Sequence, residues 1–212
     1  SEELRRRRER LVVGLGPAAL RPRPASSARE PAAPLLTRDA IEDWVSGRVV
    51  ETPVGACFVS EVRYPLDHVH GQLPLGAILE DSPVALASLA GSSHEAEVDF
   101  GQFVFLDTET TGLAGGTGTY AFLVGLGFFD GAGFTVRQYF MRDIPEERAV
   151  LDLVRQVLEL RAGLVTFNGR AFDWPLLETR FAMARQPAPL LKAGHLDLLL
   201  PARRLWRLRL RS

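Results

Sequence analysis

The sequence predicts an α/β fold, in which helices flank a mixed sheet made of an antiparallel meander followed by parallel strands. Three observations support this prediction: apolar runs of strand length recur after residue 102, a strongly amphipathic helix follows them, and short apolar runs then alternate with a further helix. Apolar residues make up 46% of the 212-residue chain, so a sizeable core can be buried. No apolar run is long enough to span a bilayer, and we expect no membrane association.

The N-terminal part of the chain shows little of this pattern. Residues 1–40 are rich in arginine, proline and alanine, and their prolines prevent a continuous helix, so we expect a disordered tail. We expect residues 41–98 to form a small N-terminal module and linker. The elements expected here are a short helix at 38–47, strands at 48–54 and 57–64, and a helix at 76–90.

Residues 99–212 are expected to form the main domain. Phe103–Leu106 is a continuous apolar run, typical of a strand that is buried on both faces. Asp130–Gly133 has the sequence of a hairpin connection, so the strands expected at 120–129 and 134–141 should be antiparallel neighbours. The remaining expected elements are a helix at 145–161, a strand at 164–167, a helix at 172–185 and a further strand at 195–198.

Charge and cysteine content limit the class of protein only loosely. The formal net charge is −1, which by itself neither favours nor excludes nucleic acid as a partner. The sequence begins with charged residues and not with a basic region followed by an apolar stretch, so we expect no secretory signal. The single cysteine, Cys57, excludes an internal disulfide and fits a reducing compartment, and we expect a cytoplasmic protein.

Two carboxylates, Asp107 and Glu109, follow the buried apolar run. Residues i and i+2 of a strand point the same way, so both should face one point at the carboxyl edge of the sheet. Two carboxylates aimed together repel unless a cation lies between them, and hard oxygen ligands suit Mg²⁺ or Mn²⁺. The alternative is that the strand simply ends in polar residues and a turn, because a lone Asp-x-Glu is a weak signal.

A second polar group, from Asn168 to Asp173, follows the strand expected at 164–167 and opens a helix. Asp173 falls in the first turn of that helix, where the helix dipole stabilises a carboxylate. Taken alone, Asp173 is equally well explained as a helix-start residue and Asn168 as a turn former. The occurrence of both groups in one chain favours a shared site.

The two groups together resemble a known family. Asp107-Thr-Glu-Thr-Thr-Gly112 resembles the first motif of the DnaQ-like (DEDD) 3′-5′ exonucleases, and Asn168-x-x-x-Phe172-Asp173 resembles their second motif. The fuller stretches Phe105–Tyr120 and Thr166–Asp173, together with His195-Leu-Asp-Leu-Leu, are similar to the YprB-like ribonuclease H-like domain proteins of bacteria.

This resemblance, which covers roughly residues 102–210, implies a ribonuclease H-like fold, with which the expected order of strands and helices agrees. It implies a metal-dependent phosphodiester hydrolase of the 3′-5′ exonuclease type that acts on nucleic acid, either DNA or RNA. Two ions, Mg²⁺ or Mn²⁺, are expected in a complete site. Asp107 would bridge both ions, Glu109 would hold the ion that activates the attacking water, and Asp173 would hold the ion that stabilises the leaving oxygen.

Three residues beside these carboxylates are expected to contact the substrate. They are Thr110, Asn168 and Arg170. Arg170 is a candidate contact for a phosphate, and Asn168 either contacts the substrate or braces the loop before Asp173.

The sequence departs from the family pattern at the fourth acidic motif. Neither Tyr-x-x-x-Asp nor His-x-x-x-x-Asp follows Asp173, and we therefore expect a chain that is incomplete at its C-terminus. Asp197 and His195 are further candidate site residues; we expect Asp197 to be structural before it is a ligand, and His195 to be a buried or supporting histidine before it is a general base. The departure leaves a second function open, a catalytically defective nucleic-acid-binding or interaction module that retains the nuclease fold.

Overall fold

The computed structural model of the chain describes residues 40–80, 99–112, 118–191 and 194–207. The chain divides into two compact units between Val45 and Ser46. The described residues of the first unit form one 3-10 turn, η1 (Ile41–Asp43), where the sequence predicted a short helix. The tail expected at 1–40 lies almost wholly outside the described residues.

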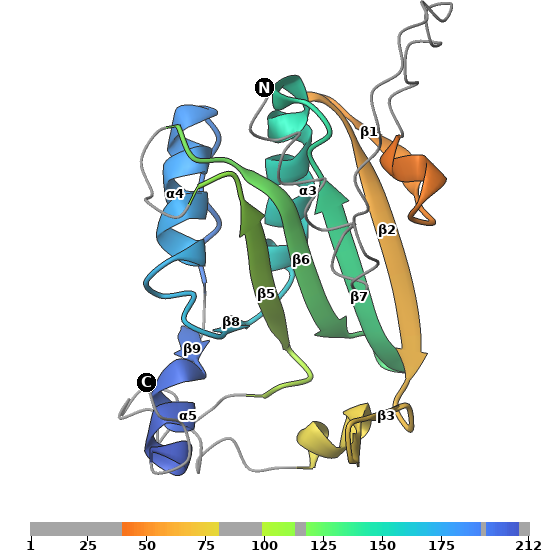
Figure 1. Ribbon diagram of the computed structural model, residues 1–212, viewed down its shortest axis with the longest axis vertical. Helices are drawn as coiled ribbons and strands as arrows, with labels where there is room; N and C mark the ends of the chain where they lie inside the picture. The colour runs from red at the N-terminus through yellow and green to blue at the C-terminus, as the bar shows by residue number, and fades with distance from the viewer. Residues whose placement is uncertain (1–39, 81–98, 113–117, 192–193, 208–212) are drawn as a thin grey trace, which may run out of the picture. The chain divides into compact units, whose positions relative to one another are not determined.

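A seven-stranded mixed sheet organises the second unit (Figure 1). Its strand order is β1-β2-β7-β6-β5-β8-β9; neighbours are antiparallel from β1 to β5 and parallel from β5 to β9. The predicted α/β fold with a meander followed by parallel strands is therefore confirmed. The strands of this sheet are β1 (Arg48–Thr52), β2 (Gly55–Pro65), β5 (Phe103–Thr110), β6 (Ala121–Phe129), β7 (Gly133–Phe140), β8 (Gly163–Thr166) and β9 (His195–Asp197), and β3 (Val69–His70) pairs separately with β4 (Leu73–Pro74).

A tight turn at residues 130–133 connects β6 to β7 in the antiparallel meander. The Asp130 N–H donates to the Gly133 carbonyl at 3.1 Å, and Gly131 between them has a φ of 86°, a conformation that suits glycine. The Asp130 carboxylate also accepts a hydrogen bond from Thr135 Oγ1 at 2.7 Å. The turn therefore joins β6 to β7 as the Asp-Gly sequence predicted.

Helices cover this sheet and connect its parallel strands. Asp143 begins the helical segment that precedes β8, because its carboxylate accepts a hydrogen bond from the Ile144 N–H at 2.9 Å. The buried face of α3 (Glu147–Glu159) packs on β1, β2, β6 and β7. Within the described part of the chain, no helix is both long and apolar enough to cross a membrane. The helices of this unit are η2 (Leu75–Leu79), η3 (Ile144–Glu146), α3 (Glu147–Glu159), α4 (Asp173–Met183) and α5 (Leu199–Trp206).

Residues 48–65 join the main sheet, whereas we expected them in a separate module within 41–98. β1 and β2 form a hairpin, and β2 pairs with β7 from Phe58 onward. The local pattern was sufficient to predict these strands but not their partner, because β7 lies far along the chain. The helix expected at 76–90 is seen only as η2, and residues 81–98 lie outside the described residues.

The face of the sheet toward α3 holds much of the core. Val124, Leu126 and Tyr139 on this face are at most 1% exposed. Cys57 is buried beside them, and burial raises the pKa of its thiol to about 12. A thiol with so high a pKa is a small core side chain and not a nucleophile.

A buried ion pair links α4 to α3. Arg180, 3% exposed, donates from Nε and Nη2 to the two carboxylate oxygens of Glu147 at 2.5 and 2.7 Å. Its guanidinium also lies 3.9 Å from the ring centroid of Tyr120, which pairs with Thr111 across the base of the glycine-rich loop after β5. The ion pair therefore holds the helix that begins at Asp173 against the end of that loop.

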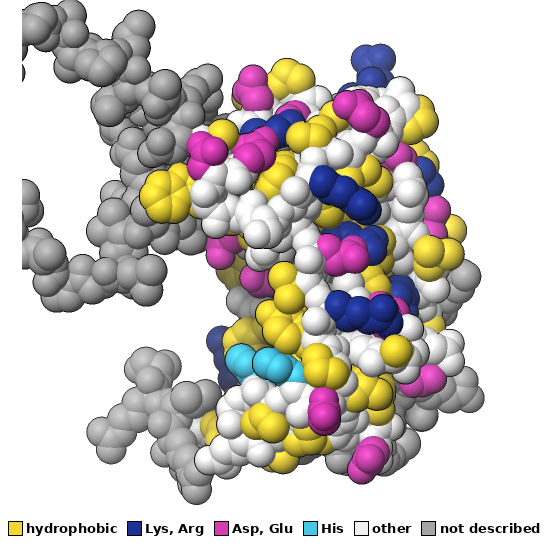
Figure 2. All heavy atoms as spheres, turned by 90° about the vertical axis from the view of Figure 1, so that its right-hand side faces the viewer, with side chains coloured by type: hydrophobic (Ala, Val, Ile, Leu, Met, Phe, Trp, Pro, Cys, Tyr) yellow, Lys and Arg dark blue, Asp and Glu magenta, His cyan; other side chains and the backbone are white. Residues whose placement is uncertain are grey.

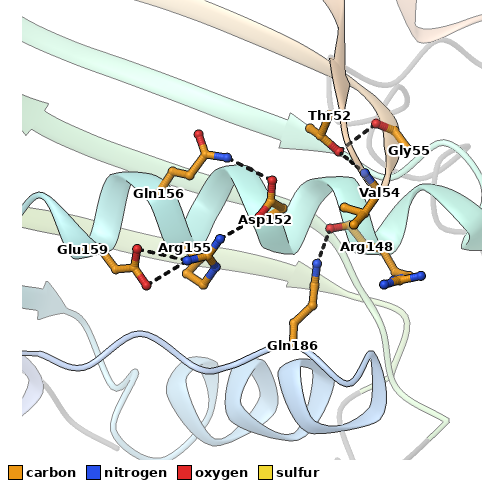
Figure 3. A network of polar contacts seen from close by, with 9 residues as sticks. All are labelled: Thr52, Val54, Gly55, Arg148, Asp152, Arg155, Gln156, Glu159 and Gln186. Carbon is orange, nitrogen blue, oxygen red and sulfur yellow. Dashed lines mark hydrogen bonds and ion pairs between the residues drawn. The ribbon is translucent and has the colours of Figure 1, made fainter.

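The solvent face of α3 carries a polar network that also reaches α4 (Figure 3). Arg155 donates to Asp152 at 2.8 Å and to Glu159 at 2.9 Å. Gln186, just after α4, donates to the carbonyl oxygen of Arg148 at 3.0 Å. Solvent-facing ion pairs such as those of Arg155 contribute only about 0–1 kcal/mol each and lie within α3, so Gln186 provides the contact of this group with the segment after α4.

Charges of both signs are interspersed in the view of Figure 2. Arg63 pairs with Asp130 at 2.6 Å, and Arg137 pairs with Glu61 at 2.5 Å, so basic and acidic side chains of β2 and its neighbours occur together. These two arginines are therefore partly neutralised by neighbouring carboxylates.

Candidate active site

Strand β5 presents Asp107 and Glu109 on one face of the sheet. β5 pairs with β6 without a register shift as far as Glu109, so its side chains alternate between the two faces of the sheet. Thr108, which lies between the two carboxylates, therefore points to the other face. Both carboxylates are exposed. β8 pairs with β5 only as far as Phe105, so the carboxyl end of β5 extends beyond its parallel neighbour. This end of the strand can therefore be reached from the loop that follows β8.

Asp173 reaches the same end of β5 from the first residue of α4. Its side chain is 9% exposed, and its Oδ1 accepts a hydrogen bond from Thr108 Oγ1 at 2.5 Å. The N-terminus of α4 favours a carboxylate at this position. The residue between the two carboxylates of β5 thus makes the direct contact with α4.

Asp107 and Asp173 lie within electrostatic range of each other. Partial desolvation, and then repulsion from Asp173, raise the pKa of Asp107 above its ordinary value, while a hydrogen bond from the Thr108 backbone lowers it. A cation relieves the repulsion between two such carboxylates. Carboxylate oxygens are ligands that suit Mg²⁺ and Mn²⁺, so the chemistry of this pair fits the ions that the resemblance implies.

Glu109 does not complete a three-carboxylate cluster with this pair. Among the described residues, no group of three or more His, Cys, Asp or Glu side chains lies close enough together to hold a metal ion. The convergence of all three carboxylates therefore stays a prediction. Asp173 binds the strand at Thr108, which strand alternation directs to the face opposite Asp107 and Glu109.

The loop before α4 is anchored on Asp197 of β9. The backbone N–H groups of Asn168 and Arg170 donate to the two carboxylate oxygens of Asp197 at 2.7 and 3.0 Å. Asn168 has a φ of 66°, which asparagine tolerates better than most residues. The Arg170 guanidinium donates to the carbonyl oxygen of His195. In this structure the Asn168 backbone braces the loop, whereas substrate contacts of Asn168 and Arg170 stay predictions.

His195 lies between this loop and α4. Its Nε2 is 2.7 Å from Thr166 Oγ1, and its ring meets that of Trp174 edge-on with 6.3 Å between centroids. Burial, and then the positive charge of Arg170, lower the pKa of His195 to about 4 against the opposing effect of Asp197. The imidazole is therefore neutral at ordinary pH and supports the packing of Trp174 and Thr166.

The structure adds two threonines that the sequence analysis does not single out. Thr108 lies inside the first motif, but strand alternation turns it away from the two acidic residues on either side, so the motif does not predict its contact with Asp173. Thr166 is the last residue of a buried strand. A hydroxyl group at such a position indicates a polar partner, which in the structure is His195. Thr110, an expected substrate contact, donates to the carbonyl oxygen of Gly112 at 2.9 Å and so supports the turn after β5; its contact with substrate stays a prediction.

Comparisons with known proteins place the chain in a family. The sequence model described as the RNase_H superfamily matches residues 104–212, which include α4, β9 and all of β5 except its first residue. The chain is also similar to "Uncharacterized protein YprB" of Bacillus subtilis (strain 168), with 37% identity over 155 residues. That match covers 71% of this chain but 37% of the relative, so the chain spans well under half of the relative's length.

Proposed function

Since the chain belongs to the RNase H superfamily, we propose that it is a metal-dependent phosphodiester hydrolase of the 3′-5′ exonuclease type that acts on nucleic acid. The observation that carries this proposal is the proximity of Asp107 and Asp173, whose repulsion a cation would relieve. Asp107 and Asp173 would hold the ion, with Glu109 of the same strand as a further ligand. A bound divalent ion supplies Lewis-acid stabilisation of phosphoryl oxygen and makes a bound water more acidic.

The protein's own residues orient these groups. Thr108 fixes the rotamer of Asp173 through its hydroxyl group, and the N-terminus of α4 stabilises the negative charge of that carboxylate. Arg170, on the loop that leads to Asp173, would contact a phosphate of the strand, and Asn168 and Thr110 would contact the substrate beside it. The superfamily supports a nucleic-acid substrate; the choice between DNA and RNA is left to experiment.

A cleavage assay tests the proposal. Single strands of DNA and RNA labelled at the 5′ end are incubated with the chain in Mg²⁺ or Mn²⁺, and we expect a ladder of products shortened from the 3′ end. Asp107→Ala should abolish the ladder, because it removes one of the two central carboxylates. Glu178→Gln is the matched control, since Glu178 is an exposed acid on α4 and should leave the ladder unchanged. Cleavage that persists in Asp107→Ala, or that needs no metal, would contradict the proposal.

A second candidate function is a nucleic-acid-binding or interaction module that keeps the fold but does not cleave. The observation that favours it is the lack of a three-ligand cluster among the described residues. It predicts that the labelled strands bind but stay intact, and that Asp107→Ala binds them as well as the wild type. The same assay, read by gel shift and by product ladder, therefore separates the two functions.

We expect Thr108→Val to weaken Mn²⁺ binding by about 10-fold, within the range of about 10–100-fold that is usual for partners of metal ligands. Valine has nearly the same shape as threonine and suits a strand, but it cannot donate the hydrogen bond that orients Asp173. Isothermal titration with Mn²⁺ measures the change. Thr135→Val, which removes a hydroxyl from the hairpin turn, is the control and should leave Mn²⁺ affinity unaltered.

A further inference from the structure

The loop that leads to Asp173 has a conformation that requires an anchor. Asn168 lies in the left-handed region at a φ of 66°. Gly169, the next residue, approaches β8 so closely that a Cβ there would lie 2.5 Å from the Cβ of Thr166. The close approach leaves no room for a side chain at Gly169, and the positive φ of Asn168 is a sparsely populated conformation that persists where its surroundings determine it.

Asp197 provides that anchor from the neighbouring strand. Its carboxylate is 8% exposed and accepts three backbone hydrogen bonds: from Asn168 at 2.7 Å, from Arg170 at 3.0 Å and from Leu199 at 3.0 Å. Both oxygens are engaged, since Asn168 and Leu199 bind Oδ1 and Arg170 binds Oδ2. These backbone hydrogen bonds outweigh the effect of burial and lower the pKa of Asp197.

The anchored loop in turn supports the first turn of α4. The Trp174 N–H donates to the Gly169 carbonyl oxygen at 2.9 Å, so the residue after Asp173 is bound directly to the anchored segment. The carboxylate of Asp173 then meets Thr108. A continuous chain of contacts therefore runs from Asp197, through the loop, to the carboxylate at the site.

We propose that Asp197 is a positioning residue, which fixes the loop from Asn168 to Arg170 and thereby sets the place of Asp173 against Thr108. Its oxygens are committed to backbone donors, so it acts through Asp173 and is not itself a ligand. The effect of Asp197 on metal binding rests on the proposed function. Its effect on the position of Asp173 is independent of that function.

The test uses Asp197→Asn in the full chain. The side-chain amide of this variant would keep one acceptor oxygen but turn an NH₂ group toward a backbone N–H. We expect hydrogen exchange at the amides of Asn168 and Arg170 to become at least about 10-fold faster, because exchange requires the loop to open. The side-chain carboxyl ¹³C resonance of Asp173 should shift, and Mn²⁺ affinity should fall by about 10–100-fold, the usual cost of losing an outer partner of a ligand.

Two control variants separate positioning from a general loss of stability. Asp99→Asn removes another carboxylate that holds a backbone turn, through Gly101 N–H at 2.8 Å, and should leave all three readouts unchanged. Leu158→Ala removes a fully buried side chain of α3 and should lower stability without changing Mn²⁺ affinity.

The outcomes are distinct. A loss of Mn²⁺ affinity no larger than that of Leu158→Ala would overturn the proposal, as would complete loss of Mn²⁺ binding with the loop amides still protected, since Asp197 would then be a ligand. Rapid exchange of the Asn168 and Arg170 amides in the wild type would overturn it even if the variant does not fold. If the wild type binds no Mn²⁺, the proposed function fails, and the exchange and ¹³C readouts alone decide on positioning.

Discussion

Glu147→Ala should lower the free energy of unfolding by about 3–5 kcal/mol, the usual cost of breaking a buried ion pair by removing one partner. The reason is that Arg180, 3% exposed, would keep its charge but lose both hydrogen bonds to the carboxylate. Neither the ring of Tyr120 nor the carbonyl oxygen 3.5 Å away carries a full negative charge that could replace the carboxylate. Urea unfolding followed by circular dichroism measures the change.

A double variant provides the control for this prediction. Glu147→Ala combined with Arg180→Met removes both charges, and it should be more stable than Glu147→Ala alone because no buried guanidinium that has lost its carboxylate remains. Glu178→Ala, at an exposed position on α4, should change stability by no more than about 0.5 kcal/mol. Losses from the two single variants that simply add in the double variant would contradict the prediction.

Acid should destabilise the protein between pH 6.5 and about pH 4 through His195. The pKa of this histidine is lowered to about 4 in the folded state, so at intermediate pH the unfolded chain binds a proton that the folded chain does not. Stability is therefore complete above the unfolded pKa and is lost as the pH falls toward the folded one. The difference between the unfolded and folded pKa values of His195 limits this loss of unfolding free energy to about 3 kcal/mol.

Comparison with His195→Gln isolates this effect. Glutamine does not titrate, and its amide can still form a hydrogen bond with Thr166. We expect the free energy of unfolding of the wild type to fall more steeply than that of the variant from pH 7 to pH 4.5, while acidic groups contribute alike to both. Parallel curves over this range would show that His195 titrates in the same way in the folded and unfolded chains.

The sequence predicted the central part of the fold well because local signals coincide there. The apolar run of β5, the Asp-Gly turn between β6 and β7 and the amphipathic pattern of α3 each determine one element without reference to the rest of the chain. The partner of β2 was not predictable in this way, because pairing with β7 joins segments far apart in the sequence. The pattern of a short strand does not identify its neighbour.

The sequence identified candidate site residues but not the contacts that they make. The alternation rule correctly placed Asp107 and Glu109 on one face of β5. It could not show that α4 would bind the strand through Thr108, because that contact depends on how the loop after β8 is anchored. The sequence analysis expected Asp197 to be structural, but it could not identify the three backbone donors that Asp197 binds, since they meet only in the folded chain.

The pairing of β2 with β7 has a practical consequence for any shortened form of this protein. A fragment starting at residue 99, where the main domain was expected to begin, would lack β1 and β2 and would leave β7 as the edge of the sheet. The backbone groups of β7 that bind β2 would then be unpaired, and the buried Tyr139 would lose its cross-strand neighbour Val59. Bare apolar edges of this kind recruit other chains, so such a fragment should self-associate. Proteolytic trimming or recombinant expression should therefore retain the chain from Ser46 onward.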